Sequence, residues 1–308
     1  MKKNSWSHIS NCLLEPYTKP ALTIEQQADR LIERGLVVSN RSELEQFLSN
    51  VSYYRLTAYL FPFKENGEEH FKDGTTFEII CRRYNFDRRF RILVLDAIER
   101  VETALKSRIV NSFVIQYGAF DYLDVHNFNN FPQDKYDRFL NEIRDSVDRS
   151  RERFVEHFRT KYSNSDLPLW MVSELISFGT MFTMFRNMNY VEKKAIANSF
   201  KLSLAVFESW LLTLNYIRNI CAHHARLWNK RLGVQPKRPV GKGFEAWTAF
   251  DTEKPFFVLF ILSYLLHFCA PRTLWRNRVE DLLQEYNELP LHGVGFVKNW
   301  NKHPIWNN

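Results

Sequence analysis

The chain has 308 residues, of which 45% are hydrophobic and 15% aromatic, so it can form a substantial core and is not a disordered chain. Its 10 Gly and 11 Pro are too few for the many turns of a sandwich or barrel, which favours an all-α fold. The balance of 42 Lys+Arg against 35 Asp+Glu gives a net charge of +7, which is compatible with a polyanionic partner without proving one.

Short helices are predicted at the N-terminal end of the chain. Thr23 and Gln26 have the spacing of a capping box at the start of the first helix. Ser42 is the expected cap of the second helix, and the third is expected to end at Pro62. Together they form the predicted N-terminal helical unit, 1–75.

One long helix is expected next, beginning at Thr75 or Thr76 after a polar loop and continuing to about residue 117. Apolar residues at three- and four-residue spacing predict its buried stripe, which consists of Ile92, Leu95, Ile98, Val101, Leu105 and Ile109. The other faces of this helix are expected to carry its charges, among them Arg82, Arg83, Arg88, Arg89 and Arg91.

The second half of the chain is also predicted to be helical. The expected helices lie at about 136–162, 168–188, 204–228, 255–270 and 272–287. Ser203 is the expected cap of the third of these helices. We expect a main helical domain at 76–275, followed by a helix end and an irregular, aromatic tail at 276–308.

The apolar stretch 255–270 is shorter than the roughly 20 residues of a membrane-spanning helix, and His267 interrupts it. It is therefore predicted to be a buried core helix, and no membrane association is expected. The N-terminus has no apolar run typical of a signal peptide, and the four cysteines form no CxxC pair. These features predict a protein of the reducing cytoplasm.

Several standard sites are absent from the sequence. It contains no Walker-type phosphate loop, GxGxxG loop, HExxH zinc motif or GxSxG nucleophile elbow, and no metal site is indicated. The remaining candidates for chemistry lie in the stretch 210–229, WLLTLNYIRNICAHHARLWN. This apolar helical pattern contains the polar residues Arg218, Asn219, His223 and His224.

The helical spacing of these residues is informative. Asn219 and His223 share a face, whereas Arg218 and His223 point about 140° apart. One straight helix cannot direct both at one atom without the reach of the Arg side chain. Either a distortion near Asn219 or a second copy of the helix would solve this. The nearly all-round apolar surface of 206–220 favours the second copy, because such a helix is central in a domain or shared with a partner.

These residue types suit the cleavage of RNA. Imidazole can take the proton of the 2′-hydroxyl or give one to the leaving 5′-oxygen near neutral pH. The guanidinium of Arg218 is permanently charged and can bind the phosphate oxygens as negative charge builds there, so no metal or cofactor is required. Asn219 can orient the histidine or bind phosphate.

A core polar network is the alternative interpretation of these side chains, and for isolated residues it is the more common case. The following segment favours an active site, because 218–242 contains no Asp or Glu and includes Trp228, as in a surface that tracks phosphates. A solvated loop can be equally basic. The predicted RNA-binding residues are Arg226, Lys230, Arg231, Lys237 and Arg238.

The motif Arg218-Asn219-Ile220-Cys221-Ala222-His223 matches the R-N-x-x-x-H signature of the HEPN superfamily of ribonucleases. The wider sequence resembles the Abi-like (abortive infection, AbiD/AbiF) family. The resemblance is carried by Ser52-Tyr-Tyr-Arg-Leu, Phe86-Asp-Arg, Ala97-Ile-Glu-Arg-Val-Glu, Ser177-Phe-Gly-Thr, the stretch 216–229 and Gly295-Phe-Val-Lys-Asn-Trp.

This resemblance implies an all-α, HEPN-type bundle in which two domains pair to build one composite RNase cleft. The implied products carry a 2′,3′-cyclic phosphate and a 5′-hydroxyl, and the implied role is bacterial antiphage defence or a toxin–antitoxin-like system. Since the chain has one complete motif, the cleft requires a homodimer. Some members are similar to toxins restrained by a small RNA.

By motif position, Arg218, Asn219 and His223 are the expected catalytic residues. His224, one residue beyond the motif, and Arg100 and Glu102, on the long helix, are expected supporting residues. Two other functions are kept as alternatives. The protein would hold a structured small RNA without cleaving it, or it would act purely as a structural or interaction protein. The sequence identifies neither the RNA substrate nor the phage trigger nor the kind of antitoxin.

Overall fold

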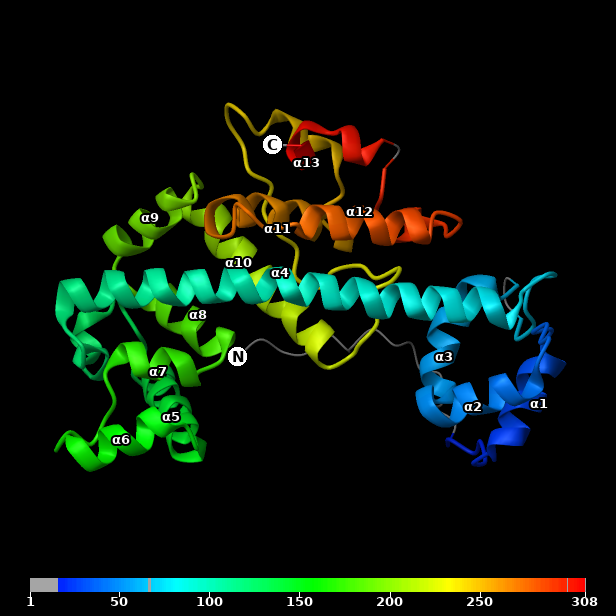
Figure 1. Ribbon diagram of the computed structural model, residues 1–308, viewed down its shortest axis with the longest axis horizontal. Helices are drawn as coiled ribbons and strands as arrows, with labels where there is room; N and C mark the ends of the chain where they lie inside the picture. Colours follow the sequence, from blue (N-terminus) through cyan, green and yellow to red (C-terminus); the bar gives the residue numbers. More distant parts are fainter. Residues whose placement is uncertain (1–15, 66–67, 298, 308) are drawn as a thin grey trace. The chain divides into compact units, whose positions relative to one another are not determined.

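The computed structural model describes residues 16–65, 68–297 and 299–307. Within these ranges the regular elements are α-helices and short 3-10 helices, accompanied by two isolated β-bridges (Figure 1). The predicted all-α fold is therefore confirmed. The chain divides into two compact units, 1–81 and 82–308.

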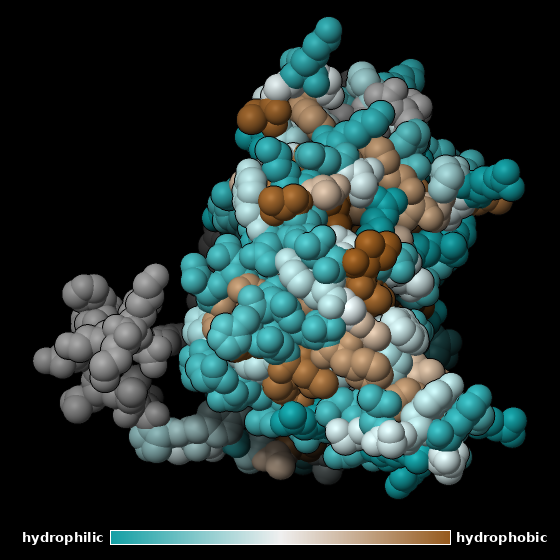
Figure 2. Space-filling model, turned by 90° about the vertical axis from the view of Figure 1, so that its left-hand side faces the viewer, coloured by the Kyte–Doolittle hydropathy of each residue, from teal (hydrophilic) through white to brown (hydrophobic). Residues whose placement is uncertain are grey.

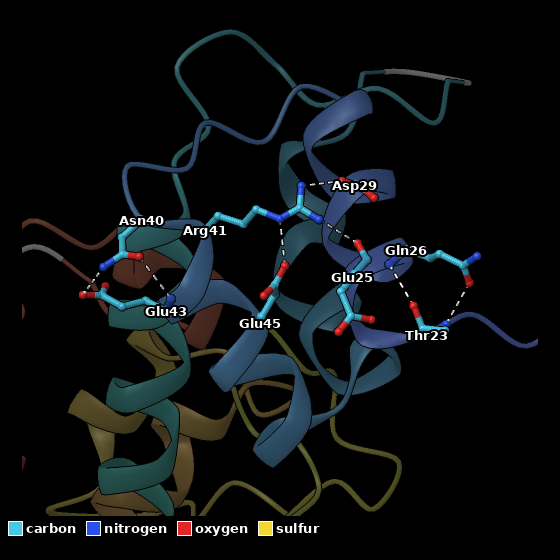
Figure 3. A network of polar contacts seen from close by, with 8 residues as sticks. All are labelled: Thr23, Glu25, Gln26, Asp29, Asn40, Arg41, Glu43 and Glu45. Atoms are coloured by element: carbon cyan, nitrogen blue, oxygen red, sulfur yellow. Dashed lines mark hydrogen bonds and ion pairs between the residues drawn. The ribbon is translucent and has the colours of Figure 1, made fainter.

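The first unit is built from short helices. They are α1 (Ile24–Glu33), α2 (Arg41–Val51), α3 (Tyr53–Leu60), the 3-10 turn η1 (Phe61–Phe63) and the first residues of α4. The predicted capping box of Thr23 and Gln26 is present at the start of α1. Arg41 fastens α2 to α1, because its guanidinium donates to the side chains of Glu45 and Asp29 and to the carbonyl of Glu25 (Figure 3).

Two details of this unit differ from prediction. The cap of α2 is Asn40, whose side chain accepts from the Glu43 N–H, and not Ser42, which lies inside the first turn. Asn is as good an N-cap as Ser, so sequence alone does not separate them. The third helix ends at Leu60 and continues as the 3-10 turn through Pro62, because proline is tolerated in the first turn of a helix.

The long predicted helix is the single helix α4 (Phe77–Tyr117) of 41 residues. Thr76 accepts a hydrogen bond from the Ile79 N–H at 3.3 Å at its start. Ile98, Val101, Leu105 and Ile109 are buried as predicted. The stripe was extended wrongly at its N-terminal end, where Ile92 is 52% exposed. Leu95 is half-buried, and the buried residues there are Val94 and Ala97, each one residue before a predicted stripe position.

Two arginines of α4 also depart from prediction. Arg83 and Arg91 are 7% and 4% exposed, so they do not lie on a solvent-exposed charged face. Arg91 forms an ion pair with Asp87, one turn earlier and fully buried. The guanidinium of Arg83 lies over the ring of Trp228, 5.7 Å from its centroid. Both arginines serve contacts inside the second unit.

The middle of the second unit contains more helix breaks than predicted. Its elements after α4 are η2 (Asp121–Leu123), η3 (Val125–Asn127), α5 (Gln133–Arg149), α6 (Arg153–Lys161), α7 (Leu169–Leu175), α8 (Phe178–Asn187) and α9 (Tyr190–Ser199). The helix predicted at 136–162 breaks at Ser150, whose hydroxyl accepts from the Glu152 N–H in a local turn. The one predicted at 168–188 breaks before Ser177, which caps α8.

The last helices contribute much of the core of this unit. They are α10 (Leu204–Ala222), the 3-10 helix η4 (Glu245–Ala249), α11 (Pro255–Cys269) and α12 (Trp275–Glu285). The helix α11 is the buried helix predicted from its apolar sequence. Trp210 of α10 stacks on Trp247 of η4, with ring centroids 5.2 Å apart. In the described part of the chain, no helix combines the length and apolar character needed to cross a membrane.

Ser203 precedes α10 as predicted, but its side chain makes no capping hydrogen bond there. The tail contains η5 (Leu291–Val294), η6 (Trp300–Lys302) and α13 (Pro304–Asn307), and it closes on the core through Trp306, which is 1% exposed. Gly295 has a φ of +100°, and a side chain there would collide with Lys254. On the face drawn in Figure 2, hydrophobic side chains lie in small groups among hydrophilic ones.

Candidate active site

The helix α10 ends at Ala222, so the predicted helix 204–228 was too long at its C-terminal end. His223 is the C-cap residue. Two backbone hydrogen bonds follow, from the His224 N–H to the Cys221 carbonyl at 3.1 Å and from the Ala225 N–H to the Ile220 carbonyl at 2.9 Å. These are the two bonds of a Schellman motif, which turns the chain sharply away from the helix axis.

His224 occupies the left-handed position of this motif, with a φ of +56°. Glycine usually stands there, because a side chain in this conformation costs about 1–2 kcal/mol. Histidine is one of the residues that tolerates the left-handed region better than most. His224 therefore carries backbone strain that a glycine would not, directly beside His223.

The motif side chains lie at the surface. Arg218 is half-buried, and Asn219, His223 and His224 are exposed. A core polar network would be buried, so that alternative interpretation is wrong for these residues. The distortion near Asn219 is also absent, because α10 is continuous from Leu204 to Ala222. Instead, the Arg218 side chain reaches sideways, and its Nη1 donates to Asn219 Oδ1 at 3.5 Å.

The residues between the motif side chains anchor the end of α10. Ile220 and Cys221 are 8% and 1% exposed. Burial raises the pKa of the Cys221 thiol to about 12, so it stays protonated at neutral pH. A protonated thiol is a poor nucleophile, so Arg218, Asn219 and the histidines remain the candidate functional groups of this segment.

The segment after the motif is held by a buried acid on α4. Asp87 is fully buried, and its Oδ1 accepts hydrogen bonds from the N–H groups of Leu227 at 3.1 Å and Trp228 at 2.6 Å. Its carboxylate also pairs with Arg91. The Asp87 carboxylate therefore fixes the chain three residues beyond His224.

Sequence reasoning missed this role of Asp87, although its stretch was among those that carry the family resemblance. A signal was available in the sequence. Asp87 lies among Phe86, Phe90 and the other apolar residues of α4, and Arg91 follows one turn later. A carboxylate on an apolar helix face with an i,i+4 arginine indicates a buried pair with a further hydrogen-bonding task.

Trp228 does not act as a stacking platform for bases. It is 2% exposed, and its ring packs edge-on against Phe86 with centroids 5.4 Å apart. The expectation that Trp228 belongs to a phosphate-tracking surface is wrong. The ring instead anchors the segment that Asp87 holds.

The basic segment after Trp228 runs back along α10. The Gly233 N–H donates to the Tyr216 hydroxyl at 3.4 Å, and the Lys237 N–H donates to Ser209 Oγ at 2.8 Å. The Trp210 indole N–H donates to the Lys237 carbonyl at 2.8 Å. Because increasing loop numbers meet decreasing helix numbers, the loop is antiparallel to α10 and leads away from the motif.

Four of the five predicted RNA-binding residues lie on this segment, whereas Arg226 precedes Trp228, and their environments differ. Arg231, Lys237 and Arg238 are exposed, whereas Arg226 and Lys230 are half-buried. Arg231 pairs with Glu253, and Arg238 donates to the Phe250 carbonyl at 2.6 Å. Arg231 and Arg238 therefore also stabilise the loop that carries them. Lys237 is exposed, and no side-chain contact of it is described, so its ammonium group is accessible for a phosphate.

The two supporting residues predicted on α4 make contacts elsewhere. Arg100 pairs with Asp96 at 3.3 Å, and Glu102 pairs with Lys106 at 3.3 Å. Lys106 in turn donates to the Ile176 carbonyl, in the turn before α8. Among the described residues the structure gives neither of them a contact with Arg218 or His223, so it does not bring them to the motif.

The sequence model of the Abi-like protein family matches residues 46–229. This span is more than half of the chain and contains the motif of α10 together with Asp87. The chain belongs to the Abi-like protein family. Membership supports a part in abortive-infection defence. Comparison of this Abi-like protein with curated proteins and with solved structures gives no match.

Proposed function

We propose that this Abi-like protein is a metal-independent endoribonuclease of bacterial antiphage defence, acting in abortive infection or in a toxin–antitoxin-like system. The observation that carries the proposal is the surface position of the half-buried Arg218 and the exposed Asn219 and His223 at the end of α10, beside the buried Ile220 and Cys221. Surface Arg, Asn and His side chains on an end held by Asp87 fit a site built to bind a substrate.

In the proposed reaction, one imidazole removes the proton of the ribose 2′-hydroxyl, and that oxygen attacks the adjacent phosphorus. The bond from phosphorus to the 5′-oxygen breaks, and an imidazolium gives the leaving oxygen its proton. The products are a 2′,3′-cyclic phosphate and a 5′-hydroxyl. Arg218 binds the phosphate oxygens as charge builds on them, and Asn219 orients His223 or the phosphate.

A homodimer supplies the second imidazole in this proposal. Ala205, Leu212 and Asn219 follow one another at seven-residue spacing, which is nearly two helical turns, and all three are exposed. Leu212 is 41% exposed. An uncharged stripe that leads to the motif suits a contact with the same stripe of a second copy. Two copies of Arg218 and His223 would then share one cleft.

The test is cleavage of total RNA by the purified protein in EDTA. The double variant Arg218→Ala/His223→Ala, purified in the same way, controls for contaminating nucleases, and His126→Ala controls for loss of an exposed histidine. We expect cleavage by the wild type and by His126→Ala only, with 5′-hydroxyl ends that polynucleotide kinase labels directly. Cleavage that EDTA abolishes, or that the double variant retains, would contradict the proposal. Intact RNA that copurifies and stays uncut would support the RNA-holding alternative.

His224→Gly is expected to separate stability from activity. Glycine relieves the left-handed strain, so we expect the free energy of unfolding to rise by about 0.5–1 kcal/mol. If the imidazole takes part in proton transfer, the cleavage rate should nevertheless fall at least about tenfold. Urea denaturation and initial cleavage rates measure the two effects. His224→Asn, which also tolerates a positive φ, should be as slow as the glycine variant. Full activity of both variants would exclude a role for His224.

A further inference from the structure

Two adjoining cavities are lined by the C-terminal half of α11 and by Arg276 of α12. The larger, of about 220 Å³, is lined by Lys201, Gly243, Trp247, Tyr264, His267, Phe268 and Arg276. The smaller, of about 100 Å³, is lined by Ser263, Leu266, His267, Ala270, Pro271, Thr273 and Arg276. His267 and Arg276 belong to both, so the two cavities meet at these side chains.

The residues that line the cavities suit a ligand that carries an anionic group and an aromatic ring. Neither lining contains Asp or Glu. Arg276 and His267 line both cavities, and Lys201 lines the larger one. The larger cavity has aromatic walls, and the smaller one is polar at Ser263 and Thr273. Together their volumes lie just inside the lower end of the roughly 300–1,000 Å³ of ordinary small-molecule sites.

Arg276 is unusual for a half-buried arginine. Burial lowers its pKa. Its guanidinium donates to the Ser263 backbone carbonyl at 3.4 Å. The charge of Glu280 partly offsets the effect of burial on this pKa, although no ion pair joins the two side chains in the described structure. Glu280, the acid one turn further along α12, accepts instead from the Trp306 indole at 2.6 Å. A charged group held in this way is ready to pair with an anion from outside the chain.

Ser263 provides an independent sign. It is fully buried, and its Oγ has no hydrogen-bond partner in the described structure although it lines the smaller cavity. A buried hydroxyl without a partner is costly, and such groups are rare in folded proteins unless water or a ligand satisfies them. An anion in the smaller cavity would accept from this hydroxyl and from Arg276 together.

We propose that the paired cavities bind a nucleoside monophosphate. Its phosphate lies in the smaller cavity against Arg276 and Ser263, and its base lies in the larger one beside Phe268 and Tyr264. The site is separate from the motif of α10. It meets that helix through aromatic contacts, since the rings of Tyr264 and Trp210 are 5.6 Å apart between centroids.

The test uses isothermal titration of the full-length protein with adenosine 5′-monophosphate, adenosine and inorganic phosphate. We expect one molecule of the monophosphate to bind per chain, and adenosine and phosphate each to bind at least about tenfold more weakly. Arg276→Gln should weaken the monophosphate about 10–100-fold. Arg272→Gln, which alters an exposed arginine just before α12, should leave its affinity unchanged.

Ser263→Ala separates a binding role from a structural one. If Ser263 only packs, Ser263→Ala should be at least as stable as the wild type and bind the monophosphate equally well, because the substitution merely removes an unpartnered hydroxyl. If Ser263 contacts the ligand, Ser263→Ala should be equally stable but should bind the monophosphate several-fold more weakly. The double variant Arg218→Ala/His223→Ala should bind like the wild type, so the result does not depend on ribonuclease activity. Equal affinity of wild type, Arg276→Gln and Ser263→Ala, or equal affinity for phosphate and monophosphate, would overturn the proposal.

Discussion

Replacing Arg218 by alanine should lower the rate of RNA cleavage about 10²–10³-fold, the usual effect of removing one group that stabilises charge in a transition state. The thermal unfolding midpoint should change little. Arg218 is only half-buried, and its described contact is a long hydrogen bond to the exposed Asn219. Its loss therefore leaves no buried group without a partner.

Arg218→Lys is the sharper variant, because it keeps the charge and removes the planar guanidinium. Lysine binds phosphate as a point charge, so it should recover only part of the lost rate. Arg151→Ala, which removes an exposed arginine outside the motif, is the matched control and should cleave at the wild-type rate. If Arg218→Ala cleaves as fast as this control, Arg218 does not stabilise the transition state and the proposed mechanism is wrong.

Mixed dimers extend this experiment to the composite cleft. When wild-type and Arg218→Ala chains are co-expressed in equal amounts, a site contained in one chain would retain about one half of the wild-type activity. A cleft that needs Arg218 from both copies would retain about one quarter, since only pairs of wild-type chains are active. The activity is measured as a function of the fraction of wild-type chains. A linear dependence indicates a site within one chain, and a quadratic dependence indicates a cleft that needs Arg218 from both copies.

Much of the fold follows from the sequence because its strongest signals are regular. The stripe from Ile98 to Ile109 predicts α4, and the apolar run at 255–270 predicts α11. The breaks at Ser150 and before Ser177 were missed. Each depends on one serine hydroxyl that bonds a nearby backbone N–H, and the hydrophobic period does not register such a local bond.

The candidate site likewise contains features that the sequence predicts and features that it does not. Its motif residues are local in sequence, so Arg218, Asn219 and His223 were found together. The left-handed conformation of His224 and the hydrogen bonds of Asp87 were not predicted. The first depends on the chain turning after Ala222. The second joins residues about 140 positions apart, which no local spacing reveals. The burial of Trp228 was missed for the same reason, because its partners lie on α4.

Asp87→Ala should be the most destabilising single change considered for this chain. Removing one partner of a buried ion pair costs about 3–5 kcal/mol, because the other charge stays buried without compensation. Arg91 would lose this buried ion pair, and the N–H groups of Leu227 and Trp228 would lose their acceptor. Urea denaturation followed by tryptophan fluorescence measures the loss. Asp145→Ala, at an exposed position, should stay within about 0.5 kcal/mol of the wild type.

A second replacement separates the two tasks of Asp87. In Asp87→Ala/Arg91→Met the buried charge of Arg91 is gone as well, so much of the lost stability should return. The N–H groups of Leu227 and Trp228 still lack their acceptor, so the segment after His224 stays loosely held. We therefore expect the double variant to be folded and nevertheless slow in RNA cleavage. Recovery of both stability and cleavage would mean that Asp87 serves only to neutralise Arg91. Recovery of stability alone would mean that its hydrogen bonds position the histidines.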